Sequence, residues 1–125
     1  MRLLLDTQIV YWCFVEPRSL PEAARRAIRE AELVYISAVS VWEIAIKVRI
    51  GKMNADPGRI VHLMEEAGFE ELPVFLRHTL IVADLPLHHG DPFDRLLVAQ
   101  AISEPLHLIT ADTQLRQYSE LVIQV

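Results

Sequence analysis

The 125-residue chain contains a single cysteine and no long uninterrupted apolar segment. One cysteine excludes an internal disulfide and argues against a thiolate zinc site, so we expect Cys13 to be a small buried hydrophobic residue. Near the N-terminus, Asp6 follows only three apolar residues, which is too early for a signal-peptide core, and no later run reaches the length of a membrane span. We therefore expect a cytoplasmic protein without a membrane partner.

An excess of positive charge is also missing, because 12 Lys and Arg residues face 17 Asp and Glu residues, for a net charge of -5. This balance argues against an extended nucleic-acid surface held by bulk electrostatics, although acids gathered around cations would reverse the local field. Hydrophobic residues make up 52% of the chain, which excludes a disordered protein. The positive mean hydropathy suggests apolar surface kept for a partner, so we expect an oligomer.

Short apolar runs alternate with helix-start signals along the chain. Strands are expected at residues 2–5, 33–37, 69–74, 106–110 and 121–125, and helices at about 19–32, 37–51, 56–68, 76–84 and from 91 onward. Tyr11, Trp12 and Phe14 are interpreted as residues of a packing, partner or dimer contact, with stacking on nucleic-acid bases as the alternative. The alternation predicts an α/β fold in which residues 1–125 form one domain, with a parallel sheet of about five strands and helices on both faces.

The stretch that begins at Asp91 places a carboxylate beside an apolar helix face. Asp91 is a natural N-cap, Pro92 suits the first helical position, and apolar residues recur at helical spacing after Asp94. A carboxylate at the edge of a core must be hydrogen-bonded, paired or bound to a metal, because a bare charge there costs several kcal/mol. The rest of the chain is therefore expected to supply partners for Asp94.

Four acids fall where a parallel sheet binds ligands, beyond the carboxyl ends of its strands or in the first turn of a following helix. They are Asp6, Glu43, Asp94 and Asp112. Each also has an ordinary structural explanation. Asp6 would be a turn former, and Glu43 a capping-box partner of Ser40 or an i+4 partner of Lys47. Asp94 would interact favourably with the helix dipole, and Asp112 would be an N-cap. Gathered together, however, these acids would repel one another unless a cation neutralised them.

A site made only of carboxylate oxygens suits Mg²⁺ or Mn²⁺ and not zinc. Such a site can deprotonate a bound water, orient it toward a phosphate and neutralise the leaving oxygen. The acids therefore point to phosphodiester hydrolysis.

Four segments of the chain resemble the PIN-domain ribonucleases, and specifically the VapC toxins of bacterial toxin-antitoxin pairs. The segments are Leu3-Leu4-Leu5-Asp6-Thr7, Ser40-Val41-Trp42-Glu43-Ile44-Ala45-Ile46-Lys47, Asp91-Pro92-Phe93-Asp94-Arg95 and Ile109-Thr110-Ala111-Asp112. The resemblance spans the whole chain. It implies a Mg²⁺- or Mn²⁺-dependent endoribonuclease that forms a homodimer, is held inactive by a cognate antitoxin, and meets DNA only through that antitoxin.

The same resemblance implies roles for individual residues. Asp6, Glu43, Asp94 and Asp112 would form the acidic metal site, and Thr110 would supply a supporting hydroxyl. Gln8 departs from the family's pattern, in which His, Asn or Ser is more usual at this position.

Several further residues are candidates at the margin of this site. Asp91 is either only a helix cap or also a contact to metal or to a metal-bound water. Arg95, beside Asp94, is the preferred phosphate contact. His88 and His89 are expected to be solvated loop residues. His62, His78 and His107 are expected at the surface or rim, and Arg25, Arg26 and Arg29 on a solvated helix face.

Rival functions make different demands on the sequence. A receiver domain would need an acidic pair after the first strand, an acceptor Asp ending a middle strand and a late Lys, and none of these is present. A haloacid-dehalogenase-like phosphatase would need a second Asp two places after Asp6, where the chain has Gln8. A non-catalytic partner-binding domain stays open, and it would bind a partner without metal-dependent RNA cleavage.

Overall fold

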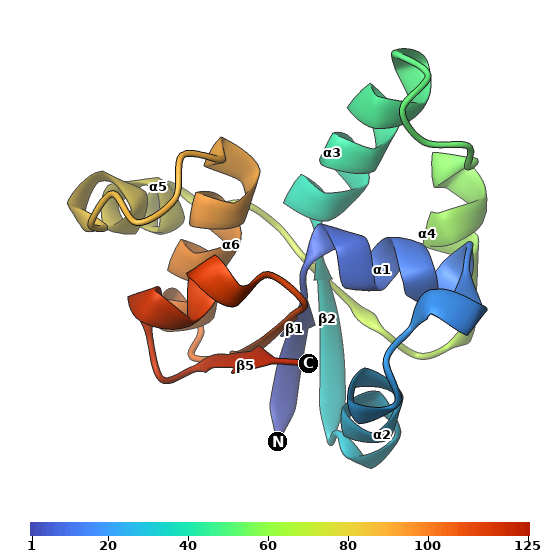
Figure 1. Cartoon of the computed structure of the whole chain (residues 1–125), viewed down its shortest axis with the longest axis horizontal. Helices are drawn as coiled ribbons and strands as arrows, with labels where there is room; N and C mark the ends of the chain where they lie inside the picture. Colours follow the sequence, from blue (N-terminus) through green and yellow to red (C-terminus); the bar gives the residue numbers. More distant parts are fainter.

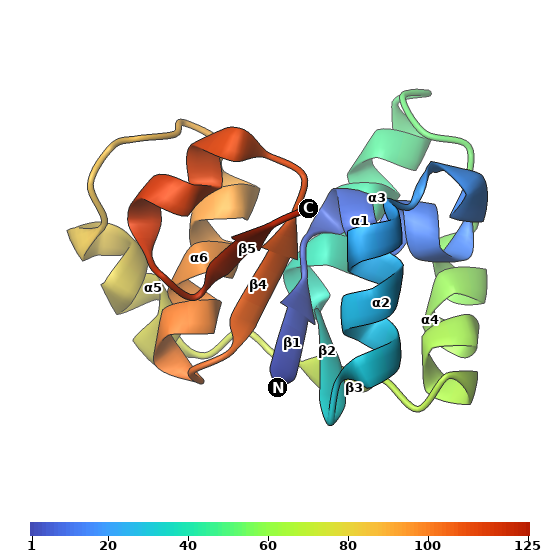
Figure 2. The ribbon, with the colours of Figure 1, turned by 60° about the horizontal axis from the view of Figure 1, so that its bottom comes forward.

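Five parallel strands form one sheet in the order β3-β2-β1-β4-β5; Figure 1 shows β1 and β2 side by side, and Figure 2 labels all five strands. In the computed structural model, which describes residues 1–125, β1 (Arg2–Leu5) is central, with β2 (Leu33–Ser37) and β4 (His107–Thr110) on its two sides. The edges are β3 (Glu70–Leu72) and β5 (Val122–Gln124). The predicted α/β architecture with a parallel sheet of about five strands is thus confirmed.

Six α-helices cover the two faces of the sheet, as Figure 2 shows. They are α1 (Thr7–Phe14), α2 (Glu22–Glu30), α3 (Ala38–Arg49), α4 (Pro57–Glu66), α5 (Leu76–Asp84) and α6 (Pro92–Ser103), with short 3₁₀ helices at Pro17–Ser19 and Thr113–Tyr118. None of the helices combines the length and hydropathy that a membrane-spanning segment needs.

Side-chain alternation along β1 divides the interior into two cores. Leu3 and Leu5 pack with residues of α1, α2 and α4 on one face, whereas Leu4 packs with residues of α6 on the other. All three leucines are fully buried. A central parallel strand is covered on both faces and therefore reads as a continuous apolar run rather than an alternating one.

Three local expectations from the sequence are wrong. Residues 7–14, where the sequence predicts no helix, form α1, and Asp6 accepts a hydrogen bond from the backbone of Ile9 as its N-cap. Helix α2 begins at Glu22, later than the expected start near residue 19, and has no side-chain cap. Helix α3 begins after the N-cap Ser37, which places Glu43 in its second turn instead of its first.

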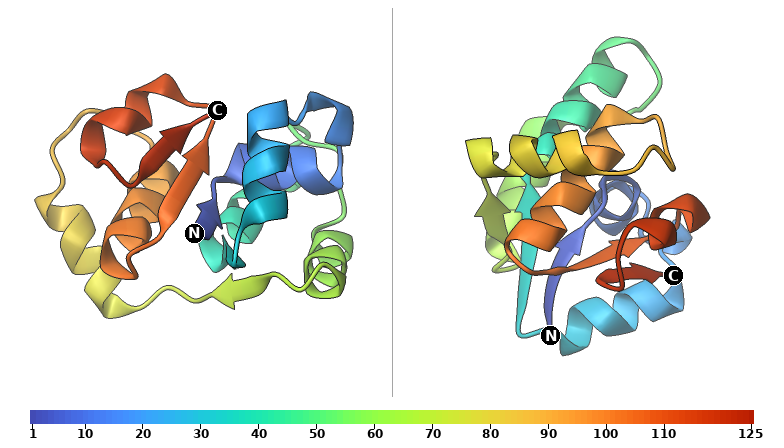
Figure 3. Two further views of the ribbon diagram at one scale, coloured as in Figure 1. Left: turned by 90° about the horizontal axis from the view of Figure 1, so that it is seen from below. Right: turned by 90° about the vertical axis from the view of Figure 1, so that its left-hand side faces the viewer.

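The order in which strands are added switches from one side of β1 to the other, and this switch determines where the functional edge lies. From β1 the chain adds β2 and then β3, after which α5 and α6 return it to β4 on the opposite side of β1. In Figure 3 the segment through β3 runs from α4 at one side of the molecule to α5 at the other. Ligands of such sheets bind where the strand order switches, here beyond the carboxyl ends of β1 and β4.

Candidate acidic active site

Asp6 is the acid at the carboxyl end of the central strand, and its side chain is almost fully buried. One carboxylate oxygen accepts the Ile9 backbone N–H at 2.9 Å, and the other accepts the hydroxyl of Thr110. Thr110 ends β4, so this hydrogen bond joins two neighbouring strands at the switch point. The supporting hydroxyl expected from the sequence therefore contacts Asp6 directly.

Glu43 reaches the same edge from α3 and is equally buried. Its Oε2 pairs with Lys47 Nζ at 2.8 Å, the i+4 pair expected from the sequence. This hydrogen bond to Glu43 raises the pKa of Lys47. The other oxygen, Oε1, is buried and has no hydrogen-bond partner within the chain. A buried carboxylate oxygen without a donor is costly, so Glu43 leaves one strong ligand position unfilled.

The first turn of α6 contributes two further acids. Asp91 is the N-cap, and its Oδ1 accepts the backbone N–H groups of Phe93 and Asp94 at 2.8 and 3.1 Å. This confirms its predicted capping role. The Asp94 carboxylate is 20% exposed, and no donor of the chain lies within hydrogen-bonding distance of it. Asp112, two residues beyond β4, caps the 3₁₀ helix Thr113–Tyr118 by accepting the Gln114 N–H at 2.9 Å.

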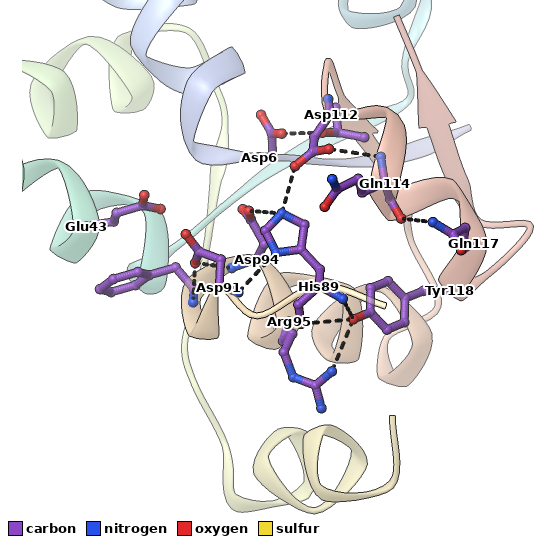
Figure 4. Close-up of polar contacts among 12 residues, drawn as sticks. Asp6, Glu43, His89, Asp91, Asp94, Arg95, Asp112, Gln114, Gln117 and Tyr118 are labelled. Carbon is purple, nitrogen blue, oxygen red and sulfur yellow. Dashed lines mark hydrogen bonds and ion pairs between the residues drawn. The ribbon is translucent and has the colours of Figure 1, made fainter. Parts of the chain in front are cut away.

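These acids surround one cavity of about 250 Å³. Its walls carry carboxylates from four segments of the chain, together with Lys47, Gln8 and a few small or apolar residues; the acids are Asp6, Glu43, Asp91, Asp94 and Asp112. Figure 4 shows Asp6, Asp112, Asp94 and Glu43 approaching this space from different elements. The structure thus brings together all four acids expected from the sequence.

The electrostatics of the cavity make negative charge expensive. Burial raises the pKa of Asp6 to about 6, against the hydrogen bonds from Thr110 and Ile9, and the charges of Glu43 and Asp112 raise it further. Burial also raises the pKa of Asp94 to about 7, reinforced by the charges of Asp91, Asp6 and Glu43. Crowded, desolvated carboxylates of this kind accept either protons or a cation.

His89 differs from the solvated loop residue that was expected. Its Nε2 lies 3.0 Å from Asp112 Oδ2 and 3.6 Å from Asp94 Oδ2, and the side chain is 17% exposed. The Nδ1 atom accepts the Asp91 backbone N–H at 3.0 Å. His88, by contrast, is exposed, as expected. Of these two adjacent histidines, His89 faces the acids and His88 does not.

A family model described as PIN domain matches residues 3–121 of the chain. The chain belongs to the PIN-domain family. The family membership expected from the four sequence segments is therefore confirmed.

This PIN domain is similar to the curated protein "Ribonuclease VapC22" of Mycobacterium tuberculosis, with 29% identity over 120 residues that cover 93% of this chain and 91% of that protein. Among solved structures it is similar to VapBC2 from Rickettsia felis bound to a promoter DNA fragment, with a TM-score of 0.69, 16% identity and coverage of 100% and 98% of the two chains. A toxin-antitoxin complex from Klebsiella pneumoniae gives a TM-score of 0.68, 18% identity and coverage of 98% and 96%. The two structural likenesses establish the fold.

Arg95 of this PIN domain is the expected site residue that lies apart from the acids. Its guanidinium donates to the backbone oxygens of Pro86, Val82 and Leu85 and to the Tyr118 hydroxyl. In Figure 4 the side chain extends away from the carboxylates toward Tyr118. These hydrogen bonds fasten the loop before α6, and the expected role of Arg95 as a phosphate contact stays a prediction.

His78 is a second correction, because this residue expected at the surface is fully buried. Its ring accepts the Phe75 backbone N–H at 3.0 Å and contacts Glu104 at 2.8 Å. It lies between α5 and α6 and contributes to their packing rather than to the acidic cavity.

The residues around the cavity fit a divalent cation. Five of the lining residues offer carboxylate oxygens, Glu43 Oε1 has no partner, and His89 Nε2 lies 3.6 Å from the Asp94 carboxylate, beyond hydrogen-bonding distance. Carboxylate oxygens of Asp94 and Asp112 lie within 4.8 Å of each other and of a ring nitrogen of His89, so one ion could bind both carboxylates. Hard oxygen ligands of this kind favour Mg²⁺ or Mn²⁺.

Proposed function

We propose that this PIN domain is a Mg²⁺- or Mn²⁺-dependent endoribonuclease and the toxin of a toxin-antitoxin pair. The observation that carries the proposal is the convergence of buried acids on one cavity, with an unpartnered oxygen on Glu43 and a carboxylate with a raised pKa on Asp94. A bound cation would relieve this repulsion, and strongly raised pKa values gather at functional sites. The name of the relative from Mycobacterium tuberculosis supports RNA as the substrate.

Each residue of the site has a distinct part in this function. Asp6, Glu43, Asp94 and Asp112 would hold the cation, and Thr110 fixes one oxygen of Asp6. Lys47 neutralises one oxygen of Glu43, which leaves Oε1 aimed at no protein donor. Asp91 caps α6 and adds negative charge beside Asp94.

A bound divalent cation would supply a water of lowered pKa and would neutralise charge on the phosphate. The net reaction adds one water across a phosphodiester bond, so that one P–O bond forms, another breaks and the leaving oxygen gains a proton. No side chain needs to form a covalent bond to phosphorus. The acidic walls alone would repel RNA, which makes activity depend on the cation.

An apolar groove supports the proposal of a protein antitoxin. A groove of about 480 Å³ lies between α3, α4 and β2, and its apolar lining includes Trp42, Met64 and Phe69. Acids gather at its rim, namely Glu65, Glu70 and Glu71. An antitoxin segment with apolar and basic side chains would complement this surface, and helix α3 would bring that segment close to Glu43.

A second apolar surface supports the proposal of a homodimer. Leu76 and Leu80 lie one turn apart on α5 and are 83% and 69% exposed. Val74, Phe75 and Leu87 extend this α5 patch. Arg77 is already paired with Glu104 of its own chain, so the apolar side chains would carry the contact, and two antiparallel copies of α5 would pack Leu76 against Leu80 around a twofold axis. The self-complementary pattern favours a second copy of the chain as the occupant.

The central test is RNA cleavage by the Asp94→Asn variant. This change removes one charge from the cavity while keeping the size of the side chain, so we expect cleavage to fall at least about 100-fold, with wild-type secondary structure. Glu30→Gln, an exposed acid at the end of α2, is the matched control and should cleave at the wild-type rate. Chelation of divalent ions should abolish wild-type cleavage. Equal cleavage by wild type and Asp94→Asn would refute the nuclease proposal.

Antitoxin binding separates this function from a non-catalytic partner-binding domain. A nuclease toxin should lose growth inhibition with Asp94→Asn but still bind its antitoxin, since the apolar groove does not include Asp94. A partner-binding domain would keep both properties and would show no metal-dependent cleavage in either form.

A further inference from the structure

The loop between α5 and α6 directs one imidazole at the acidic cavity. His89 Nε2 lies 3.0 Å from Asp112 Oδ2 and 3.6 Å from Asp94 Oδ2, between two of the acids proposed to hold the cation (Figure 4). The sequence gives no reason for this position, because His89 and Asp112 are 23 residues apart.

The other ring nitrogen identifies which atom of His89 carries a proton. Nδ1 accepts the Asp91 backbone N–H at 3.0 Å, so its lone pair is already engaged. In a neutral imidazole the proton then lies on Nε2, which makes this atom a donor to Asp112. A protonated Nε2 has no lone pair for a metal. His89 therefore acts on the site through a carboxylate and not as a ligand.

The loop is fastened so that the ring keeps this position. The Tyr118 hydroxyl accepts the His89 backbone N–H at 2.8 Å. Arg95 donates to the same hydroxyl at 3.1 Å and to the backbone oxygen of Pro86 at 2.7 Å. The loop is thus tied to both α6 and the last 3₁₀ helix.

Asp112 is held from two sides as a result. Its Oδ1 accepts the Gln114 backbone N–H at 2.9 Å and its Oδ2 faces His89 Nε2. Without His89, the side chain of Asp112, which is 34% exposed, would be held through Oδ1 alone and could turn toward solvent. Partners of this kind orient ligating carboxylates and raise the affinity of metal sites.

We propose that His89 is a positioning residue of the metal site, which holds Asp112 in its orientation toward the cavity through an Nε2–H hydrogen bond. The proposal rests on the proposed metal-dependent function. Tyr118 and Arg95 position His89 in turn, so the chain from Arg95 to Asp112 links the loop before α6 to the site.

Two substitutions of His89 separate the two ring nitrogens. The amide of Gln reaches the position of Nε2 and can donate to Asp112, but it places no acceptor at the position of Nδ1. The amide of Asn reaches the position of Nδ1 and can accept from Asp91, but it cannot reach Asp112. His88→Asn, a neighbouring exposed histidine, serves as the loop-matched control.

The experiment measures Mn²⁺ binding to the whole chain without RNA, from the electron paramagnetic resonance signal of the free ion, and then kcat and KM for RNA cleavage. We expect His89→Asn to bind Mn²⁺ about 10-fold to 100-fold more weakly, with the loss of cleavage recovered at high Mn²⁺ concentration. His89→Gln should stay within about threefold of wild type, and His88→Asn should be unchanged. Nitrogen NMR of the metal-free wild type should show a protonated Nε2 and an unprotonated Nδ1 on His89.

Each other result overturns the proposal in a recognisable way. If His89→Asn binds Mn²⁺ as tightly as wild type, His89 does not position the site. If His89→Gln binds Mn²⁺ as weakly as His89→Asn, the Nε2–H donor does not position Asp112, and a directly coordinated nitrogen in the electron spin-echo spectrum of bound Mn²⁺ would make His89 a ligand instead. If the wild type neither binds Mn²⁺ nor cleaves RNA, the proposed function fails together with this inference.

Discussion

Ionised Asp94 lowers the stability of the metal-free fold, yet the proposed metal site needs this charge. Its pKa is raised from 3.8 to about 7, mainly by burial and then by Asp91, Asp6 and Glu43. In the unfolded chain the carboxyl group ionises near its ordinary pKa, so between about pH 4 and pH 7 the folded state binds the additional proton. The contribution of Asp94 to the stability of the metal-free chain should therefore fall as pH rises from about 4 to about 7 and stay at its lowest above pH 7.

The Asp94→Asn variant should remove the loss of stability that ionised Asp94 causes. Without metal at pH 8 we expect it to be more stable than wild type by on the order of 2 kcal/mol, because one repelled charge is gone. At pH 4 the difference should nearly vanish, since Asp94 is then protonated in the folded wild type. Added Mg²⁺ should stabilise wild type and affect the variant far less. Urea denaturation at both pH values with and without Mg²⁺ measures this, and a less stable variant at pH 8 would contradict the argument.

The acidic residues could be located from the sequence because their positions follow from element boundaries. Asp6 and Asp112 follow strands, and Asp91 and Asp94 open a helix, so local signals sufficed to bring them to one edge. Their ligand roles stay predictions. His89 and His78 could not be assigned in the same way, since their partners Asp112 and Glu104 are 23 and 26 residues away. Only the folded loop and the packed helix pair reveal those contacts.

Among the elements, α1 is the one that local signals failed to identify. It spans only eight residues and carries Tyr11 and Trp12, and aromatic residues are weak helix formers. Its N-cap, Asp6, looks equally like a residue that closes a strand. The helix forms because it buries Ile9 and Val10 against the central strand. Intrinsic helix propensity does not include this stabilisation by tertiary packing.

The packing of α5 on α6 depends on a polar cluster far from the acidic cavity. Glu104, 18% exposed, pairs with Arg77 at 3.1 Å and with His78 at 2.8 Å. Hydrogen bonds from Arg77 and then from His78 lower the pKa of Glu104 from 4.5 to about 2. The stabilisation is therefore complete above about pH 4.5 and is lost as pH falls toward 2, where Glu104 becomes protonated in the folded chain as well.

Glu104→Gln should loosen this helix pair without touching the metal site. We expect lower stability than wild type at pH 7, by about 1 kcal/mol, and faster amide hydrogen exchange in α5. The difference from wild type should shrink as pH falls from 4.5 to 2. Glu66→Gln, an exposed acid paired with His62, is the control and should change stability little. A Glu104→Gln chain with wild-type stability at pH 7 would show that the cluster contributes nothing.

At the scale of the molecule, the alternation of strands and helices predicted the fold class but not the strand order. The apolar run of β1 does not predict that this strand lies in the centre, with β2 and β4 on its two sides. That order follows from where the chain can bury both faces of each strand, which is a property of the whole set of helices. Because β1 and β4 are neighbours in this order, Asp6 and Thr110 come into contact at one edge of the sheet, where the acidic cavity lies.

The α5 patch extends the argument beyond one molecule. Leu76, Leu80 and Leu87 are between 69% and 88% exposed, and large exposed apolar patches mark sites of interaction. Each leucine buried in a dimer would contribute about 2 kcal/mol, and a twofold axis counts every contact twice. We therefore predict that the wild type is a dimer formed through this patch.

Leu80→Glu should convert that dimer to a monomer, because it places two like charges near the twofold axis and removes the central apolar contact. Light scattering after gel filtration should give twice the 14.3 kDa chain mass for wild type and that mass alone for the variant. Ile50→Glu, an equally drastic change at an exposed apolar residue at the end of α3, should remain dimeric. A dimeric Leu80→Glu together with a monomeric Ile50→Glu would move the interface to α3, where Trp42 and the C-cap residue Ile50 are each 58% exposed.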